Sequence, residues 1–344
     1  MNIRENVPIS KLTTMRLGGN ARYVVEINEL SDIPEAYKFA AERKLPTFIL
    51  GGGANTIGRD EGFFGVILLN KLKGIDVISE TSDEVVVRAM GGEAWDDLVN
   101  FCSERGYSGI ETMSKIPGTV GAAPVQNIGA YGQDISQVLE SVEAFDRQTH
   151  ELVVIGKEDM NMSYRSTIFN TGKDAGRYFI VAVTLILEND ASLEPPFYNS
   201  LQKYLDENHI TDYSPMSIRR AVAEIRADKL PDPEKEASSG SFFKNIYLTK
   251  EQEVEAKNNN LKIWEKPDGK KMINSGYLIE GAGLKGAELY GMKVSDKAAL
   301  VLINKSAKSY SDLDRARTEI QKKVQEKYGF LLEQEPVEIQ SGEK

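Results

Sequence analysis

The segment 116–132 has the residue types that could line a buried cofactor. It combines four glycines with small side chains and one amide pair, Gln126-Asn127. Glycine lets backbone amides approach a ligand closely and takes a positive φ without strain, and neutral amides supply hydrogen bonds inside an apolar pocket. By itself the segment fits a glycine-rich structural loop equally well, so its interpretation depends on two other segments.

The second segment is Gly51-Gly52-Gly53-Ala54-Asn55, which follows directly on the apolar run 46–50. A strand that leads into a glycine turn commonly presents backbone N–H groups to phosphate oxygens. The turn is not a Walker motif, because no Gly-Lys-Ser/Thr follows, and it lacks the third glycine of a dinucleotide fingerprint. A simple hairpin turn is the alternative.

The third segment, 238–245, places hydroxyls, an aromatic pair, a lysine and an amide within one short stretch. Ser241 has no basic partner that the sequence reveals, so it would be a poor nucleophile, but a serine in a dry pocket can donate a proton over a short distance. Elsewhere, Arg165 offers a planar, permanently charged fork that suits a carboxylate. A buried structural serine and a surface arginine are the alternatives.

Together these segments resemble the UDP-N-acetylenolpyruvoylglucosamine reductase family, flavoenzymes of peptidoglycan precursor synthesis. The resemblance runs in order over nearly the whole chain, and its most specific parts are the central glycine segment and Gly-Ser-Phe-Phe-Lys-Asn. The matching residues are 14–19, 50–55, 116–132, 163–165, 229–233 and 240–245.

The resemblance implies an α+β fold, with a two-lobed FAD-binding domain of the PCMH/vanillyl-alcohol-oxidase type plus a smaller α+β substrate-binding domain. The first lobe would be 1–70 with 329–344, the second 71–229, and the substrate-binding domain 230–328. The implied reaction is NADPH-dependent reduction, through bound FAD, of UDP-N-acetylglucosamine enolpyruvate to UDP-N-acetylmuramate. Another FAD-dependent oxidoreductase of the same fold is the alternative.

The resemblance also implies residue roles. Ser241 would protonate C2 of the enolpyruvyl group, and Arg165 would stabilise the negative charge that develops on the substrate carboxylate as hydride arrives at C3. Glu335 would be the third catalytic residue. The implied cofactor-binding residues are Gly51, Gly52, Gly53, Ala54, Asn55, Gly118, Thr119, Gly121, Ala122, Asn127, Gly129 and Arg226. The implied substrate-binding residues are Tyr131, Tyr164, Tyr198, Lys229, Lys244 and Asn245.

The position of the catalytic glutamate is where the chain departs from the family pattern, Leu-Glu-Pro-Glu-Val after the last helix. Here 332–337 reads Leu-Glu-Gln-Glu-Pro-Val. Counting from Gly329 selects Glu335, whereas the displaced proline keeps Glu333 as an alternative. In an extended tail these two glutamates share one face and Glu338 points away from them.

Two more positions depart from the pattern. Ala54 stands where many family members have serine, so one hydroxyl donor to the flavin pyrophosphate is absent. Backbone N–H groups can still serve, and FAD and NADPH are both expected. The sequence around Tyr198 matches poorly.

The bulk composition is that of an ordinary globular protein, with 344 residues, 41% apolar and 27% charged. A net charge of −10 argues against a nucleic-acid partner. There is no apolar run near 18 residues and no apolar signal core, so we expect a cytoplasmic protein without a membrane partner. Only two histidines and one cysteine occur, which argues against a metal site or a Ser-His-Asp arrangement. We expect a monomer that binds a small UDP-sugar.

The elements that would position these residues can be predicted from periodicity. Strand patterns cover 21–27, 46–50, 65–69, 84–90, 141–145, 151–155 and 178–187. Helices are expected after Ser31, around the core residue Cys102, from Pro215 to Lys229, and from Ser311 to Tyr328 with Gly329 as the stop. The segments between strands are too short for a full Rossmann array. Residues 189–215 read as irregular, because they are polar and interrupted by prolines.

Overall fold

The first lobe is built on a sheet of mixed direction. The computed structural model describes residues 1–265 and 269–340. The elements of this lobe are β1 (Asn2–Pro8), β2 (Asn20–Ile27), α1 (Asp32–Glu42), β3 (Thr47–Leu50), β4 (Thr56–Gly58) and β5 (Phe63–Asn70). The sheet order is β1-β2-β5-β3, in which β1 is antiparallel to β2 and the other pairs are parallel. The three strands predicted here are confirmed.

The second lobe is built on a five-stranded antiparallel sheet with the order β11-β10-β12-β7-β6. The strands of this sheet are β6 (Ile75–Glu80), β7 (Glu84–Met90), β10 (Leu139–Asp146), β11 (Glu151–Gly156) and β12 (Tyr178–Glu188). A separate two-stranded sheet consists of β8 (Gly129–Ala130) and β9 (Gln133–Asp134). Its helices are α2 (Trp95–Ser103), α3 (Asn199–Glu207) and α4 (Pro215–Lys229). Cys102 is buried on α2, as predicted. In the first lobe, α1 packs its Tyr37 ring on Phe145 of β10, and this contact joins the two lobes.

Helix α3 was not predicted. It forms because Leu201 and Leu205 are buried against Ile218 and Val222 of α4, and this packing stabilises a helix whose own sequence is polar. The expectation that 189–215 is irregular was therefore wrong for residues 199–207.

A buried ion pair ties α4 to α2. Arg219 donates from Nη1 and Nη2 to the two carboxylate oxygens of Asp96, at 2.6 and 3.0 Å. Although burial alone would raise the pKa of Asp96, hydrogen bonds from Arg219 and Lys115 hold it well below its ordinary value. The pair fixes the helix that carries two residues of the predicted site, Arg226 and Lys229.

We expect Arg219→Met to lower the free energy of unfolding of the second lobe by about 1 to 3 kcal/mol at pH 7, because it removes a charged partner from the half-buried Asp96 carboxylate and leaves it Lys115. A depressed carboxyl pKa adds stability that is present above the unfolded value, about 3.9, and lost as the pH falls further. The difference in free energy of unfolding between wild type and Arg219→Met should therefore become smaller below pH 4. Denaturation followed by Trp95 fluorescence tests this, with Lys203→Met in the exposed Lys203–Glu207 pair of α3 as the neutral control. An equal deficit in both variants would contradict the prediction.

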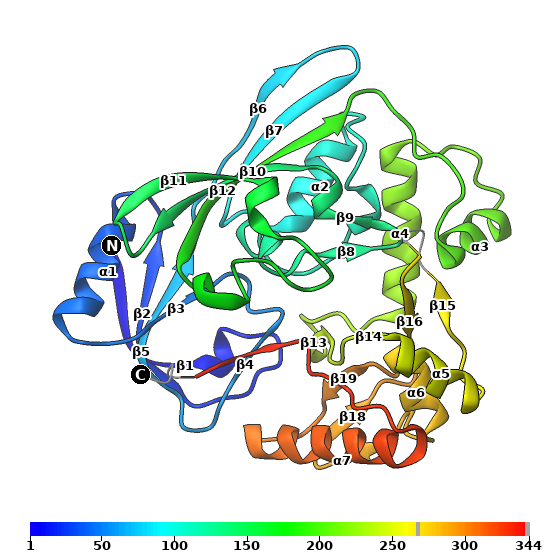
Figure 1. Cartoon of the computed structure of the whole chain (residues 1–344). Coiled ribbons are helices and arrows are strands. Elements are labelled where there is room, and N and C mark those ends of the chain that lie inside the picture. Colours follow the sequence, from blue (N-terminus) through cyan, green and yellow to red (C-terminus); the bar gives the residue numbers. More distant parts are fainter. Residues whose placement is uncertain (266–268, 341–344) are drawn as a thin grey trace.

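The described residues of the third part of the chain form two small antiparallel sheets and three helices. Figure 1 draws most of this part in yellow to orange-red. The sheets have the orders β13-β19-β18-β17 and β14-β16-β15. The elements are β13 (Ala237–Ser241), β14 (Ile246–Tyr247), α5 (Lys250–Asn258), β15 (Trp264–Glu265), β16 (Lys271–Ile273), α6 (Ser275–Gly281), β17 (Glu288–Leu289), β18 (Met292–Val294), β19 (Val301–Asn304) and α7 (Tyr310–Tyr328). Helix α7 buries an apolar stripe of Leu313, Ala316, Ile320 and Val324, and it is followed by the predicted stop, Gly329, whose φ is +81°.

The C-terminal tail belongs to two cores. Phe330 and Leu332 pack in the core of the third part, whereas Ile339 packs in the core of the first lobe. Ile339 is the last residue of β20 (Val337–Ile339), which runs parallel to β4. The division at residues 70, 229 and 328 stays a prediction, and residues 341–344 of the predicted first lobe lie outside the described residues.

Candidate active site

The two glycine segments meet in space. A Cβ built on Gly51 would lie 2.4 Å from Oγ1 of Thr119, and one on Gly52 would lie 3.0 Å from Cα of Gly118. The first segment is the turn after β3, and the second is a pair of short 3-10 turns at Val120–Ala122 and Pro124–Gln126. Such a close approach of two backbones requires glycine. The fold therefore brings together predicted cofactor residues that lie more than sixty positions apart.

Unmet hydrogen-bonding capacity lies at this meeting point. In the part of the chain that the structure describes, Oγ1 of Thr119 is buried without a hydrogen-bond partner. A Cβ on neighbouring Gly118, whose φ is +128°, would meet no atom within 4 Å. An unpartnered buried hydroxyl is costly unless something satisfies it. The residues present thus fit a polar cofactor bound along the two glycine segments.

Three other predicted cofactor glycines are needed by the fold itself. Gly53 has a φ of +64°, and a Cβ there would lie 2.0 Å from the carbonyl oxygen of Leu12. Gly121 packs on the backbone of Gly91, and Gly129 packs on Asp134 across the β8–β9 hairpin. Their glycine character therefore has a structural cause.

Asn127 is also predicted to bind the cofactor, but its side chain bonds to protein backbone. Its Oδ1 accepts a hydrogen bond from the backbone N–H of Ser136 at 3.2 Å, and its Nδ2 lies 3.4 Å from the carbonyl oxygen of Ser163. Its own carbonyl oxygen accepts from Nη1 of Arg165 at 3.1 Å. The position of Asn127 thus supports Arg165.

Asn55 links the glycine turn to the central segment and to the tail. Its Nδ2 donates to Oε1 of Gln126 at 2.6 Å and lies 3.5 Å from the carbonyl oxygen of Glu335. Its carbonyl oxygen accepts from the N–H of Val337 at 2.9 Å. Gln126 was not predicted as a site residue; its amide type beside Asn127 was the only signal in the sequence.

Arg165 and Glu335 form a buried ion pair. Nε of Arg165 lies 2.7 Å from Oε1 of Glu335, and the two side chains are 18% and 7% exposed. Burial raises the pKa of Glu335, against the opposing effect of Arg165 and Lys244. Arg165 itself is held in a left-handed conformation, with a φ of +56°, within a tight turn closed by Ser163 and Ser166.

Ser241 lies at the end of β13, beside the tail. A register shift between Ser238 and Ser241 marks a bulge, at which Gly240 has a φ of +68°, and bulges of this kind redirect the following side chain. The next residue, Phe242, accepts a hydrogen bond through its carbonyl oxygen from the N–H of Glu335 at 2.9 Å. The half-buried Ser241 hydroxyl has no hydrogen-bond partner among residues 1–265 and 269–340.

The two candidate glutamates occupy different environments. The side chain of Glu333 is 74% exposed, and its carboxylate lies 3.6 Å from Nζ of Lys244. Glu335 is enclosed and faces Arg165. The geometry favours Glu335 as the functional carboxylate.

The predicted substrate residues fall into two groups. In the first, the Tyr164 hydroxyl accepts from the N–H of Asn245 at 3.3 Å, and Oδ1 of Asn245 accepts from the N–H of Ser275 at 3.1 Å. This group lies beside Arg165 and Lys244. In the second, the Tyr131 and Tyr198 rings meet edge to face at 5.9 Å.

The remaining predicted residues lie along α4, in the glycine turn or in the central glycine segment. Arg226 donates from Nη2 to the carbonyl oxygen of Lys115 at 3.2 Å, and it lies close to the Tyr131 hydroxyl. Lys229 is exposed at the last position of α4 and makes no ion pair within the described residues. In the turn, the carbonyl oxygen of Ala54 lies 3.5 Å from Oγ1 of Thr14. In the central segment, the Ala122 methyl lies against Gly51.

Comparison with known proteins agrees with this architecture. Residues 21–156 match the family described as "FAD binding domain", and residues 232–339 match the family described as "UDP-N-acetylenolpyruvoylglucosamine reductase, C-terminal domain". A crystal structure of UDP-N-acetylenolpyruvylglucosamine reductase from Thermus caldophilus has a TM-score of 0.66 at 20% identity, covering 99% of this chain and 100% of that chain. The expected fold class is confirmed, and fold and site define a flavin-dependent oxidoreductase.

Relatives with clear sequence identity specify the family. The chain is 34% identical over 338 residues to UDP-N-acetylenolpyruvoylglucosamine reductase of Pseudomonas fluorescens (strain Pf0-1), covering 98% of both chains. It is 36% identical to the enzyme of that name from Bdellovibrio bacteriovorus, covering 98% of this chain and 99% of that one. The chain belongs to the UDP-N-acetylenolpyruvoylglucosamine reductase family.

Within 1–265 and 269–340, no helix is long and apolar enough to cross a membrane. Over the same ranges, no group of three His, Cys, Asp or Glu side chains could hold a metal ion.

Proposed function

We propose that the protein reduces the enolpyruvyl group of UDP-N-acetylglucosamine enolpyruvate to UDP-N-acetylmuramate, with NADPH as the reductant, in peptidoglycan precursor synthesis. The observation that carries this proposal is the buried Arg165–Glu335 pair. It lies between the glycine turn and the strand that ends in Ser241. The backbone of Glu335 is bonded to Phe242, the residue after Ser241, and lies 3.5 Å from Nδ2 of Asn55 in the glycine turn, which supports a site that combines a cation, a carboxyl group and a hydroxyl beside the cofactor.

FAD would be held by Gly51, Gly52, Gly118, Thr119 and Ala122, with Asn55 joining the two segments. Close backbone N–H groups and the Thr119 hydroxyl suit its polar atoms. Bound FAD supplies the hydride chemistry, which protein side chains cannot carry out. Gly53, Gly121, Asn127 and Gly129 would act by shaping this site, and Ala54 by its backbone.

The side chains would act on the substrate. Ser241 would donate a proton to C2, and Arg165 would stabilise negative charge on the carboxylate of the enolpyruvyl group. Glu335 would hold the guanidinium in place and act as an electrostatic or acid–base group. Because the pair is enclosed, these charges act in a medium of low dielectric constant, where each is stronger than in water.

The UDP-sugar would be bound by the two groups of predicted substrate residues. Tyr164, Lys244 and Asn245 lie next to Arg165 and would contact the enolpyruvyl-sugar end. Tyr131, Tyr198 and Lys229 lie on or beside α3 and α4 and would contact the diphosphate and nucleoside, because lysine and tyrosine suit such groups. We further propose that the protein works in the cytoplasm as a monomer, without nucleic acid or membrane as a partner.

The proposed function can be tested by following the flavin spectrum. Purified protein should be yellow and hold FAD, anaerobic NADPH should bleach it, and UDP-N-acetylglucosamine enolpyruvate should restore the colour. An oxidase or dehydrogenase of the same fold would instead be bleached by its alcohol substrate. Protein that takes up no FAD in a titration would refute the proposal.

Thr119→Val tests the cofactor site without relying on turnover. We expect FAD affinity to fall by about 1 to 3 kcal/mol, roughly 5- to 150-fold in Kd, if the hydroxyl bonds to the cofactor. The melting temperature of the FAD-free protein should be unchanged or higher, because the valine removes a buried polar atom that has no partner in the described residues. Ser103→Ala is the matched control, since Ser103 on α2 is also a buried, unpartnered hydroxyl. Equal FAD affinity in wild type and Thr119→Val would contradict the assignment.

A further inference from the structure

The tail that carries Glu335 crosses from the third part of the chain to the first lobe. On one side, Gln334 bridges to Phe243, and the N–H of Glu335 donates to Phe242. On the other side, β20 pairs with β4, starting with Val337 opposite Thr56. Glu335 therefore lies at the crossing, with no helix or long strand of its own to hold it.

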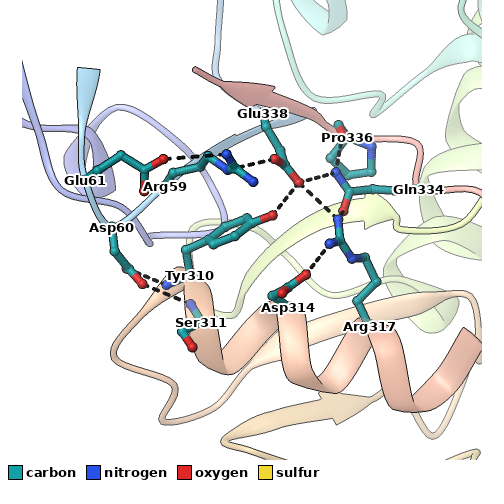
Figure 2. Close-up of polar contacts among 10 residues, drawn as sticks. All are labelled: Arg59, Asp60, Glu61, Tyr310, Ser311, Asp314, Arg317, Gln334, Pro336 and Glu338. Carbon is teal, nitrogen blue, oxygen red and sulfur yellow. Dashed lines mark hydrogen bonds and ion pairs between the residues drawn. The ribbon is translucent and has the colours of Figure 1, made fainter. Parts of the chain in front are cut away.

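Three residues farther along, the carboxylate of Glu338 is held from both sides of this crossing (Figure 2). From the first lobe, Nε of Arg59 lies 3.0 Å from its Oε2. From α7, the Tyr310 hydroxyl donates to Oε1 at 2.6 Å, and Nη1 of Arg317 donates to the same oxygen at 3.0 Å. Burial alone would raise the pKa of Glu338, but Tyr310, Arg317 and Arg59 hold it below the ordinary glutamate value.

The same cluster fixes the residues on either side of Glu335. Nη1 of Arg317 also donates to Oε1 of Gln334 at 2.7 Å, and Nε2 of Gln334 donates to the carbonyl oxygen of Pro336 at 2.7 Å. We call Arg59, Tyr310, Arg317, Gln334 and Glu338 the tail latch.

The first lobe also binds the N-terminus of α7, next to the tail latch. Asp60, next to Arg59, accepts hydrogen bonds from the N–H groups of Tyr310 and Ser311, at 2.6 and 3.0 Å. A carboxylate at a helix N-terminus satisfies unpaired donors and favours the helix dipole. Helix α7 and the tail are thus bound to one short segment of the first lobe, as Figure 2 shows.

We propose that Glu338 is a positioning residue for the reaction: through the tail latch it fixes the crossing of the tail and so holds the Glu335 carboxylate against Arg165. The inference rests on the proposed function for the role of Glu335. The Glu338 carboxylate contacts Arg59, Tyr310 and Arg317, none of which is assigned a part in the reaction. Glu338 can hold the tail because Tyr310 and Arg317 of α7 and Arg59 of the first lobe all bind its carboxylate.

Hydrogen exchange tests the latch without any turnover. In Glu338→Gln we expect the amides of Glu335 and Val337 to exchange roughly 10- to 100-fold faster, because charged hydrogen bonds that hold the tail are lost. The amides of β12 should be unchanged. Glu326→Gln is the matched control, since Glu326 is an exposed glutamate on α7, paired with Lys322 at 3.8 Å. Unchanged exchange at Glu335 and Val337 in Glu338→Gln would overturn the proposal.

Single-turnover kinetics test the link to Glu335. Glu338→Gln should slow reoxidation of prereduced enzyme by the enolpyruvyl substrate roughly 10-fold or more, and leave flavin reduction by NADPH unchanged. The double variant Glu335→Gln/Glu338→Gln should be no slower than Glu335→Gln alone, because both changes act on one group. If the double variant were slowed by the product of the two single-variant factors, Glu338 would act independently of Glu335, and the proposal would be overturned.

The proposal can still be decided if Glu338→Gln does not fold or if the wild-type enzyme is inactive on the enolpyruvyl substrate. If Glu338→Gln does not fold, Tyr310→Phe deletes a single hydrogen bond of the latch and should show the same changes in exchange and reoxidation to a smaller degree; no change would overturn the proposal. If wild-type enzyme does not reduce the enolpyruvyl substrate, the proposed function fails, while the exchange measurement still decides whether the latch fixes the tail.

Discussion

Ser241→Ala is expected to separate the two half-reactions of the enzyme. Reoxidation by the enolpyruvyl substrate should slow by roughly 10²- to 10⁴-fold, the usual contribution of a placed general acid. Bleaching by NADPH should keep its wild-type rate, because that step needs no proton from Ser241. The hydroxyl is free for this role: in the described structure no protein group bonds to it. Stopped-flow measurement of each half-reaction provides the test.

Ser238→Ala provides the control for this variant. Ser238 is a buried serine of the same strand, paired with Ile303 of β19, so its loss should affect the two half-reactions equally and slightly. If Ser241→Ala likewise slowed both half-reactions to the same extent, Ser241 would be a structural residue, and the proton would have to come from another group.

Glu335→Gln should slow flavin-to-substrate transfer by roughly 10²- to 10⁴-fold, or about 2.7 to 5.4 kcal/mol, because it removes a placed charge or proton-transfer group. Glu333→Gln should be nearly neutral, since its side chain is mainly in solvent. Both variants should retain FAD. A severe loss in Glu333→Gln with near-normal Glu335→Gln would move the assignment by two residues.

The pH dependence of the same step gives a second signature of Glu335. Burial raises the pKa of this carboxyl group above the ordinary glutamate value, so the wild-type reoxidation rate should change at a pH above that value, and Glu335→Gln should lose the inflection. A rate that falls as the pH rises would mean that the protonated carboxyl acts. A rate that rises would mean that the anion acts, as a partner of Arg165. The same inflection in wild type and Glu335→Gln would show that another group titrates.

Local pattern was enough for most of the longer elements, although β1 and β6 were not predicted. The apolar stripe of α7 and its stop at Gly329 could be read directly, because helical periodicity and a left-handed glycine are local properties. The strands of both lobes alternate or run apolar in the same way. The glycine segments were identifiable by residue type, and the family motifs carried the reaction class. Helix α3 was missed, because its stability comes from contacts with α4 rather than from its own residues.

The sequence could not decide which residues meet. Gly51 and Thr119 are far apart in the chain, and only the fold shows that their contact leaves a buried hydroxyl unpartnered. Asn127 has the type of a cofactor ligand, yet its side chain bonds to the backbone of Ser136 and Ser163.

The choice between the two glutamates shows the physical reason most clearly. In an extended segment with a period of two residues, Glu333 and Glu335 are equivalent. They differ because the tail is held between Phe242 and Asn55, which encloses Glu335 opposite Arg165 and leaves Glu333 in solvent. The sequence by itself determined the kinds of groups and the family; burial and charge pairing across distant segments, which only the tertiary structure creates, decided which carboxylate faces the site.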